Sequence, residues 1–334
     1  MTRRHISLKD IATELNLSIS TVSRALRDHP DISAEVKERV CQLAERWNYR
    51  PNPMAMGLLK SNTHIIGVII PDLATHFYSS IVSGIDNVAS RMGYYTIISS
   101  SYESFEKEKV CVENMINARV EGIIACISQE TQTYDHFKLL ADWNVPLVFF
   151  DRVCLETFFS SVVSNNQESS YFLTKHLISK GYKRIAYLGG PAHLNITRER
   201  KAGYEKALSD YNIREDATLM SYNILDYETG REATEQLLNL PEPPDAIIGM
   251  NDTLSYAAMS KIKEHGLRIP QDIALTGYTD EFHSQLVDPK LTAVSHPRLD
   301  MGERAAELLF EQLKGDTKVK QLVCDCNLLI QEST

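Results

Sequence analysis

Six residues with aromatic or polar side chains follow stretches of chain that we expect to form buried strands. They offer flat apolar faces, a carboxylate, a guanidinium, an amide and a hydroxyl, which together suit a sugar or a related polar ring. In sheets of parallel strands, ligands bind beyond the carboxyl ends of the strands. We therefore expect one binding site for a small sugar-like molecule, lined by Phe77, Tyr78, Asp151, Arg200, Asn251 and Thr279.

Each of these residues also has an ordinary structural explanation. An Asp or Asn behind a strand often caps the next helix, and Arg200 could form an ion pair at the surface. The set as a whole favours a binding site, because polar groups that converge beside apolar ones mark pockets.

Short aliphatic runs alternate with helical patterns from Ile65 onward, which predicts an α/β fold. Right-handed βαβ units of this kind stack into two doubly wound lobes with a cleft between them. We expect the lobes to be joined near Val162, 291–294 and 321–323. The runs expected to be buried parallel strands are 65–70, 95–100, 122–127, 147–150, 185–188, 246–250 and 273–277.

The first fifty residues carry another pattern, that of three short helices around one core. Ser7 followed by Asp10 predicts a capping box, and Ser18 and Ser33 are expected to cap the second and third helices. Asn16 suits a left-handed turn between the first two. The apolar residues expected to face the core are Leu8, Ile11, Ala12, Leu15, Val22, Ala25, Leu26, Val36, Val40, Leu43 and Trp47.

The second of these helices is expected to expose a face rich in hydroxyl groups. If Val22, Ala25 and Leu26 point inward, the opposite face carries the side chains of 19–21, 23 and 24. Ser and Thr hydroxyls bind phosphates or base edges, and Arg24 could pair bidentately with guanine. This chemistry suits the major groove of duplex DNA.

The charge of the chain is unevenly distributed. Residues 1–60 hold 10 Lys and Arg against 7 Asp and Glu, a net charge of +3, and the remaining residues hold 25 against 37, a net charge of −12. A bundle without a DNA partner is the alternative interpretation. The basic head on an acidic body favours DNA contact, because neutralisation of phosphates drives such binding.

The N-terminal segment resembles the lac repressor family of bacterial transcription regulators. The resemblance rests on LKDIA at 8–12, STVSRAL at 20–26, YRPN at 49–52, and Ala55 with Leu58 behind them, in the order and spacing of the family. Weaker similarity continues to the last residues. It implies a homodimer that binds a pseudo-palindromic DNA operator through Ser7, Ser18, Ile19, Ser20, Thr21, Ser23, Arg24, Arg27, Ser33, Tyr49, Asn52, Ala55 and Leu58.

The resemblance also implies that residues 51–62 form a hinge helix and a linker. In the family, the hinge helices of two subunits enter the minor groove together, and a leucine, here Leu58 by position, wedges into the central base step. Such a wedge kinks the duplex. An ordinary linker is the alternative, because a short isolated helix is marginal in water. Met56, which stands where arginine is common in the family, and Gly57, which lowers helix propensity, weaken the expected hinge helix without changing its assignment.

The resemblance assigns effector contacts to Phe77, Asp151, Arg200 and Asn251. One departure concerns GYTD at 277–280, where the family usually has two adjacent acids and Thr279 takes the place of the first. We therefore expect a less negative cleft that prefers an acidic or phosphorylated sugar, with Arg200 as the group that binds the anion.

Other classes of protein are disfavoured. No glycine-rich phosphate loop, GxSxG or HExxH motif follows a strand, so we expect neither an enzyme nor a cofactor. Six cysteines without CxxC spacing predict reduced structural thiols and no metal site. A periplasmic sugar-binding protein would need a secretion signal, and no apolar run is long enough for one or for a membrane span, so we expect a cytoplasmic protein.

The sequence therefore predicts a helix-turn-helix headpiece at 1–50, a hinge and linker at 51–62, and two lobes of the periplasmic-binding-protein type at 63–334. The first lobe is expected at about 63–161 and 293–320, and the second at about 162–292 and 321–334. The expected function is that of a transcriptional regulator, by default a repressor. A bound effector would shift the lobes and decide whether paired hinge helices form.

Overall fold

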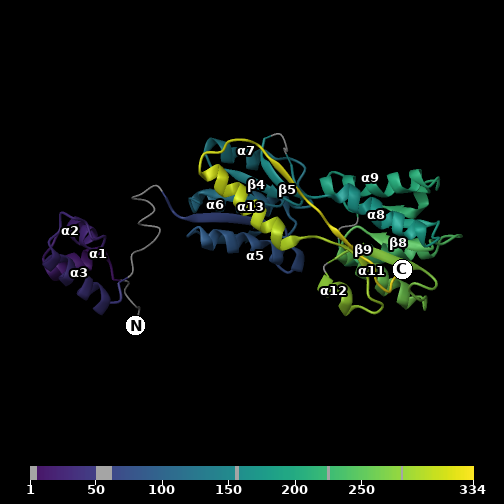
Figure 1. The fold of residues 1–334 in the computed structure, drawn as a ribbon, viewed down its shortest axis with the longest axis horizontal. Coiled ribbons are helices and arrows are strands. Elements are labelled where there is room, and N and C mark those ends of the chain that lie inside the picture. Colours follow the sequence, from purple (N-terminus) through teal and green to yellow (C-terminus); the bar gives the residue numbers. More distant parts are fainter. Residues whose placement is uncertain (1–5, 50–61, 155–157, 224–225, 280) are drawn as a thin grey trace. The chain divides into compact units, whose positions relative to one another are not determined.

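The computed structural model describes residues 6–49, 62–154, 158–223, 226–279 and 281–334. It divides into two compact units, Met1–Thr63 and His64–Thr334, whose elements are drawn in Figure 1. No helix within the described ranges is long and apolar enough to cross a membrane.

The first unit contains helices α1 (Leu8–Leu15), α2 (Ile19–Ala25) and α3 (Ala34–Arg46). The predicted capping box of α1 is confirmed, since the Ser7 Oγ accepts from the Asp10 amide at 3.3 Å and the Asp10 carboxylate accepts from the Ser7 amide at 2.8 Å. Asn16 adopts the expected left-handed conformation with φ 51°. These local signals fix where α1 begins and where the turn into α2 lies.

One apolar core holds the three helices together. Ile11, Val22 and Val40 are fully buried, one from each helix. Leu8, Leu15, Leu26, Val36, Leu43 and Trp47 are only half-buried around them. The predicted inward face of each helix is therefore confirmed, with its largest members at the edge of a small core.

The second unit is built on two six-stranded sheets. The first sheet is wholly parallel, and the second is parallel except for one antiparallel edge strand. In spatial order the first sheet holds β11 (Gln321–Cys324), β5 (Ser160–Ser164), β4 (Leu147–Phe150), β3 (Gly122–Ala125), β1 (Ile65–Ile70) and β2 (Tyr95–Ser100). The second sheet holds β12 (Asn327–Leu329), β10 (Thr292–Ser295), β9 (Ala274–Tyr278), β8 (Ala246–Gly249), β6 (Ile185–Leu188) and β7 (Met220–Ser221).

Helices cover both faces of the first sheet. Buried residues of α5 (His76–Arg91) and α13 (Arg298–Leu313) pack with Ile66, Val68 and Ile70 on one face. Residues of α6 (Phe105–Asn117) and α7 (Asp135–Asp142) pack with Ile65 and Ile69 on the other face. The alternation of β1 side chains between the two cores is what a strand buried on both faces requires.

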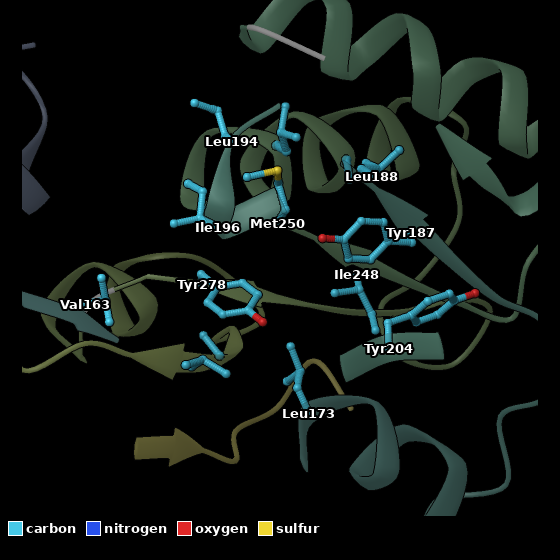
Figure 2. Packing of buried hydrophobic residues seen from close by; sticks show 14 of the residues in the cluster. Val163, Leu173, Tyr187, Leu188, Leu194, Ile196, Tyr204, Ile248, Met250 and Tyr278 are labelled. Carbon is cyan, nitrogen blue, oxygen red and sulfur yellow. The ribbon is translucent and has the colours of Figure 1, made fainter. Parts of the chain in front are cut away.

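The second sheet carries its own helices, α8 (Asn166–Ser179), α9 (Asn195–Asp210), α10 (Tyr227–Leu238), α11 (Asp252–Glu264) and α12 (Glu281–Leu286), together with the short 3-10 helix η1 (Ala217–Leu219). Figure 2 shows its core, where Tyr187, Tyr204 and Tyr278 lie among aliphatic side chains. Gly277 in β9 allows α11 to approach closely, because a Cβ there would stand 1.8 Å from the Ser255 Oγ.

The predicted joints between the lobes are wrong by a few residues. Val162 and 321–323 lie in β5 and β11 of the first sheet, and 292–294 lie in β10 of the second. Within the described residues, the chain passes between the sheets after β5, after β10 and between β11 and β12, and the yellow C-terminal segment in Figure 1 shows the last of these passages. The apolar residues mistaken for joints complete the two sheets. The expected lobes therefore divided both sheets in the wrong places.

The other predicted strands are close to those observed. β3 and β8 end earlier than expected, at Ala125 and Gly249, and β9 is shifted by one residue to Ala274–Tyr278. The following apolar residues, such as Ile127 and Met250, are buried without being strand. Burial thus extends past the ends of these strands.

Candidate functional sites

Helix α2 presents a hydroxyl-rich surface to solvent, as predicted. Its cap, Ser18, accepts from the Thr21 amide at 3.0 Å, and the Ser18 Oγ lies 2.7 Å from the Ser20 Oγ and 2.8 Å from the Thr21 Oγ1. Ile19 is 49% exposed, and the Arg24 side chain is exposed one turn further along. The three hydroxyl groups and the guanidinium lie on a scaffold fixed by the cap.

The other predicted DNA contacts are placed less uniformly. Arg27 and Ser33 are exposed, and Ser33 caps α3 by accepting from the Val36 amide at 3.4 Å. The Ser7 hydroxyl donates to the Asp10 carboxylate at 2.6 Å and is committed to the capping box. Ser23 and Tyr49 are half-buried, and burial raises the pKa of Tyr49. Asn52, Ala55 and Leu58, with the whole expected hinge helix, lie outside the described residues.

All six predicted effector contacts line one cavity of about 400 Å³ between the two sheets of the second unit. Its walls come from both lobes and include several aromatic rings. Besides Phe77, Tyr78, Asp151, Arg200, Asn251 and Thr279, the lining consists of Asp72, Thr75, Tyr102, Glu103, Gln129, Arg152, Gly190, Pro191, Leu194, Ile196, Asp226, Tyr227, Met250, Asp252, Thr253, Tyr278, His296 and Arg298.

Asp151 places an unused hydrogen-bond acceptor in this cavity. It follows β4 in a left-handed conformation with φ 56°, and its main chain is held by Val162 and Asn195 at 3.0 and 3.1 Å. The side chain is 3% exposed, and its Oδ1 has no hydrogen-bond partner among the described residues. Burial raises the pKa of Asp151, while the nearby Arg200 and Arg152 oppose that rise. A buried acceptor without a partner is unfavourable, so a ligand donor would relieve it.

Arg200 is held by other protein groups and is not an open anion-binding group. Its Nε donates to the Asn166 Oδ1 at 2.8 Å, its Nη1 to the Met250 carbonyl at 2.5 Å, and its Nη2 lies 3.2 Å from the His296 Nε2. The guanidinium lies 3.9 Å above the centre of the Tyr278 ring, and the residue is 3% exposed. Three of its five N–H groups are therefore already in use.

Gly203 explains why Arg200 sits so deep. A Cβ on Gly203 would stand 2.1 Å from the Gln167 carbonyl, so only glycine lets α9 approach α8 this closely. The Arg200 carbonyl accepts from the Ser170 hydroxyl of α8 at 2.6 Å. The close packing of α8 and α9 therefore places the Arg200 side chain in the cavity wall.

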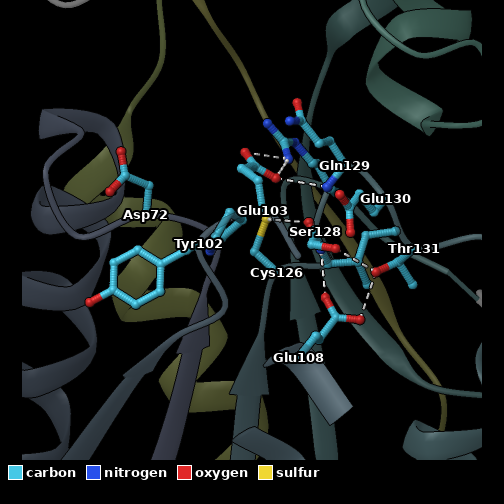
Figure 3. Close-up of polar contacts among 12 residues, drawn as sticks. Asp72, Tyr102, Glu103, Glu108, Cys126, Ser128, Gln129, Glu130 and Thr131 are labelled. Atoms are coloured by element: carbon cyan, nitrogen blue, oxygen red, sulfur yellow. Dashed lines mark hydrogen bonds and ion pairs between the residues drawn. The ribbon is translucent and has the colours of Figure 1, made fainter. Parts of the chain in front are cut away.

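A half-buried ion pair forms the wall on the first lobe. The Arg152 Nη1 contacts the two Glu103 carboxylate oxygens at 2.9 and 2.8 Å, and Glu103 also accepts from the Gln129 amide at 2.7 Å. The Arg152 Nε is buried and has no partner among the described residues. Figure 3 shows Glu103 on one side of the segment that follows β3.

A second carboxylate, that of the fully buried Glu108, contacts the same segment from its other side in Figure 3. It accepts from the Ser128 amide at 2.5 Å and the Thr131 hydroxyl at 2.7 Å, and it lies 2.9 Å from the His136 Nε2. Two carboxylates thus fix the loop that brings Gln129 to the cavity.

The remaining predicted contacts combine structural and surface roles. The Asn251 Oδ1 caps α11 by accepting from the Leu254 amide at 2.8 Å, which is the structural alternative that the sequence left open. The Thr279 Oγ1 lies 2.9 Å from the Tyr256 hydroxyl. Phe77 and Tyr78 pack edge to face with ring centres 5.2 Å apart. All four still line the cavity.

Three important residues were not predicted as contacts. Arg152 directly follows Asp151, and Glu103 follows β2, so the rule of residues behind strands could have found both. His296 follows β10, but β10 was taken for a joint between the lobes. Among the residues described, no group of three or more His, Cys, Asp or Glu side chains could hold a metal ion.

A DNA-reading helical unit followed by a two-lobed unit with an interlobe cavity defines the class of ligand-responsive transcription regulators. Residues 7–52 match the family described as bacterial regulatory proteins, lacI family, and residues 174–334 match the periplasmic binding protein-like domain. Catabolite control protein A of Priestia megaterium is 30% identical over 320 residues, covering 96% of this chain and 96% of that protein. The chain belongs to the lacI family of bacterial regulatory proteins and is a sequence-specific DNA-binding regulator.

Two solved structures extend the similarity over the whole chain. The lac repressor dimer bound to operator and the anti-inducer ONPF has a TM-score of 0.85 and 29% identity, covering 99% of each chain. The complex of the transcriptional regulator CelR with cellobiose has a TM-score of 0.75 and 26% identity, covering 98% of this chain and 100% of that one.

Proposed function

We propose that this regulator is a homodimeric repressor whose hold on a pseudo-palindromic operator is controlled by a small sugar-like effector in the interlobe cavity. The observation that carries the proposal is the buried, unpartnered Oδ1 of Asp151 in a cavity lined by aromatic rings. A sugar supplies both a hydroxyl donor for the carboxylate and C–H faces for the rings. The cellobiose complex of CelR, a protein of similar fold, supports this choice.

We propose further that the effector is uncharged. Five acids line the cavity, Asp72, Glu103, Asp151, Asp226 and Asp252, against the three arginines 152, 200 and 298. Arg152 is already paired with Glu103, and Arg200 is engaged by three protein groups. This arrangement argues against the acidic or phosphorylated sugar that the sequence led us to expect, because an anion would face the Asp151 carboxyl group, whose Oδ1 has no partner among the described residues.

A thermal-shift screen of neutral sugars, sugar acids and sugar phosphates tests this proposal. A ligand that binds the folded state raises the melting temperature. We expect a neutral sugar to give the largest shift and to bind more tightly in calorimetry than its matched acid. Tighter binding of the acid would contradict the uncharged effector, and no shift with any sugar would contradict the sugar-like class.

We propose also that the protein acts in the cytoplasm, where operator DNA is found, and by binding alone. Its relatives named above are regulators, which supports a role without catalysis. Incubation of the full chain with the best neutral sugar, followed by NMR of the sugar, should show no change. Turnover that disappears with Asp151→Asn would contradict this.

A further inference from the structure

The three connections between the lobes meet at the ring of His296. Ser164 ends β5, His296 follows β10, and Cys326 lies between β11 and β12, so each stands where the chain passes from one sheet to the other. The His296 Nδ1 lies 2.9 Å from the Ser164 Oγ and 3.1 Å from the Cys326 Sγ. One ring atom thus contacts side chains from both other connections.

The contacts of the ring define its protonation state. The Nη2 of Arg200, 3.2 Å from the His296 Nε2, can only donate, so Nε2 must be the unprotonated acceptor. The proton of the neutral ring is then on Nδ1, where it faces the Ser164 and Cys326 side chains. The ring is 8% exposed, and burial, with Arg200 and Arg298 nearby, holds the pKa of His296 well below its usual value.

The same ring forms part of the cavity wall. It stacks on Tyr278 of the second lobe, with ring centres 5.8 Å apart and planes inclined by 22°. It also packs edge to face with the ring of Phe77 from the first lobe, with ring centres 5.5 Å apart and planes inclined by 77°. A ligand that moves Phe77 or Arg200 therefore has to move His296 or break its contacts.

We propose that His296 is the positioning residue of the interlobe hinge, which ties the three connections together and transmits a displacement of the cavity wall to all of them at once. Hinges are a few residues at the ends of elements that absorb changes of backbone angle. Because one side chain joins all three, they change together, and the lobes have discrete arrangements rather than a continuum. The transmission rests on the proposed control by a ligand in the cavity, whereas the joining of the connections does not.

Hydrogen exchange at single amides of the full chain, without any sugar, tests whether His296 links the three connections between the lobes. Three amides report on the connections: Asn165, bonded to the Cys324 carbonyl at 3.1 Å, Arg298, bonded to the His296 carbonyl at 2.9 Å, and Cys326, bonded to the Asn165 Oδ1 at 2.9 Å. His296→Leu removes the polar contacts of the ring with Ser164, Cys326 and Arg200 and should speed exchange at all three amides by about tenfold or more. His296→Gln, which keeps a donor and an acceptor, should restore most of the protection.

Reference amides and a matched variant separate a hinge role from a loss of stability. Ile123 and Ala274, one in each sheet, should exchange as in the parent protein. His176→Gln alters another buried histidine, bonded to the Thr334 Oγ1 at 2.8 Å, and should leave the three connections unchanged. Equal acceleration in the sheets and connections of His296→Leu, or no rescue by glutamine, would overturn the proposal.

A second variant covers the case in which His296→Leu does not fold. Ser164→Ala removes only one of the two groups facing Nδ1, and it should still speed exchange at Arg298 and Cys326, about threefold or more. Acceleration confined to Asn165 would mean that the connections are independent and would overturn the proposal.

DNA binding tests the transmission to the operator, again without sugar. The probe is the duplex that the parent protein selects from a random pool. His296→Leu should change the affinity for this duplex by about fivefold or more, while His296→Gln and His176→Gln stay within about twofold. Equal affinity of His296→Leu and the parent protein would overturn the proposal. Hydrogen exchange and DNA binding are both measured without sugar, so they stay valid if the sugar screen fails. Failure of the proposed sugar effector can therefore be distinguished from failure of the proposed hinge role of His296.

Discussion

Asp151 is positioned by its main chain, which leaves its side chain free to bind. Its left-handed φ of 56° and its main-chain hydrogen bonds fix the carboxyl group at the end of β4. A non-glycine residue in this conformation is uncommon and often occurs at functional positions. This geometry agrees with a functional role for Asp151, in which its unpartnered Oδ1 binds a ligand.

Replacing this carboxylate should weaken the binding of a neutral sugar. Asp151→Asn keeps the size of the side chain but removes its charge, and hydrogen bonds to a charged group contribute about 2 kcal/mol, roughly a thirtyfold change in affinity. Calorimetry with the best sugar of the screen measures this loss. The exposed Asp142→Asn is the control and should bind as the parent protein does. Unchanged affinity in Asp151→Asn would remove Asp151 from the site.

His296 should make the stability of the second unit depend on pH. Burial holds the folded-state pKa of His296 well below its usual value and also lowers the pKa of His176, so the unfolded chain binds more protons than the folded chain below about pH 6.5. The free energy of unfolding should therefore fall as the pH drops from about 6.5 toward 5, by up to about 1.4 kcal/mol per pH unit for each histidine. The raised pKa of Asp151 acts in the opposite direction.

The comparison of the parent protein with His296→Gln isolates this contribution. Urea unfolding followed at several pH values should give a shallower pH dependence for the variant, because one proton uptake by the unfolded chain is gone. Parallel curves for the two proteins would show that His296 is protonated in the folded state.

The sequence predicted single cavity residues better than the ion pairs and hydrogen bonds that these residues form. Five of the six candidates share a simple signal, a polar or aromatic side chain in the segment that follows a buried strand, whereas Arg200 lies within α9, and all six line the cavity. The ion pair of Arg152 and Glu103 joins residues 49 positions apart, and the contact of His296 with Ser164 joins residues 132 positions apart. No local pattern predicts such pairs, because they depend on how the sheets are ordered.

At the scale of elements, the recognition of bases by α2 can be tested independently of the effector. Arg24→Ala should weaken binding at one base pair of each half-site by about 1–3 kcal/mol and relax the sequence preference there. Binding to a set of single-base variants of the selected duplex measures this change. A uniform loss over all variants would instead assign Arg24 to a phosphate contact.

Among the described residues, seven of the twelve strands could be predicted, including the edge strand β2, whereas β5, β7, β10, β11 and β12 could not. Strands such as β1 and β4 are short apolar runs buried on both faces, which the sequence displays directly. The outer strands β11 and β12 are only three or four residues long and partly exposed, so they carry little hydrophobic signal. The error in the lobe boundaries follows from reading β5, β10 and β11 as connections.

At the scale of the whole molecule, the predicted insertion of Leu58 between two base pairs would make the bound DNA bend. Leu58 lies outside the described residues, so its role rests on the family resemblance and stays a prediction. Leu58→Ala should reduce the bend of the bound duplex while leaving sugar affinity unchanged, because the apolar wedge is lost far along the chain from the cavity residues. Energy transfer between dyes at the duplex ends measures the bend. An unchanged bend would refute the wedge.

The most direct test of the account measures the binding of the full chain to DNA with and without its sugar. A duplex selected from a random pool, labelled for fluorescence anisotropy and measured at fixed salt, gives both affinities. We predict a pseudo-palindromic sequence bound about a thousandfold or more tightly than random DNA, and an affinity that changes about fivefold or more when the best neutral sugar is added. Equal binding of selected and random DNA, or an affinity that no stabilising sugar alters, would contradict the account.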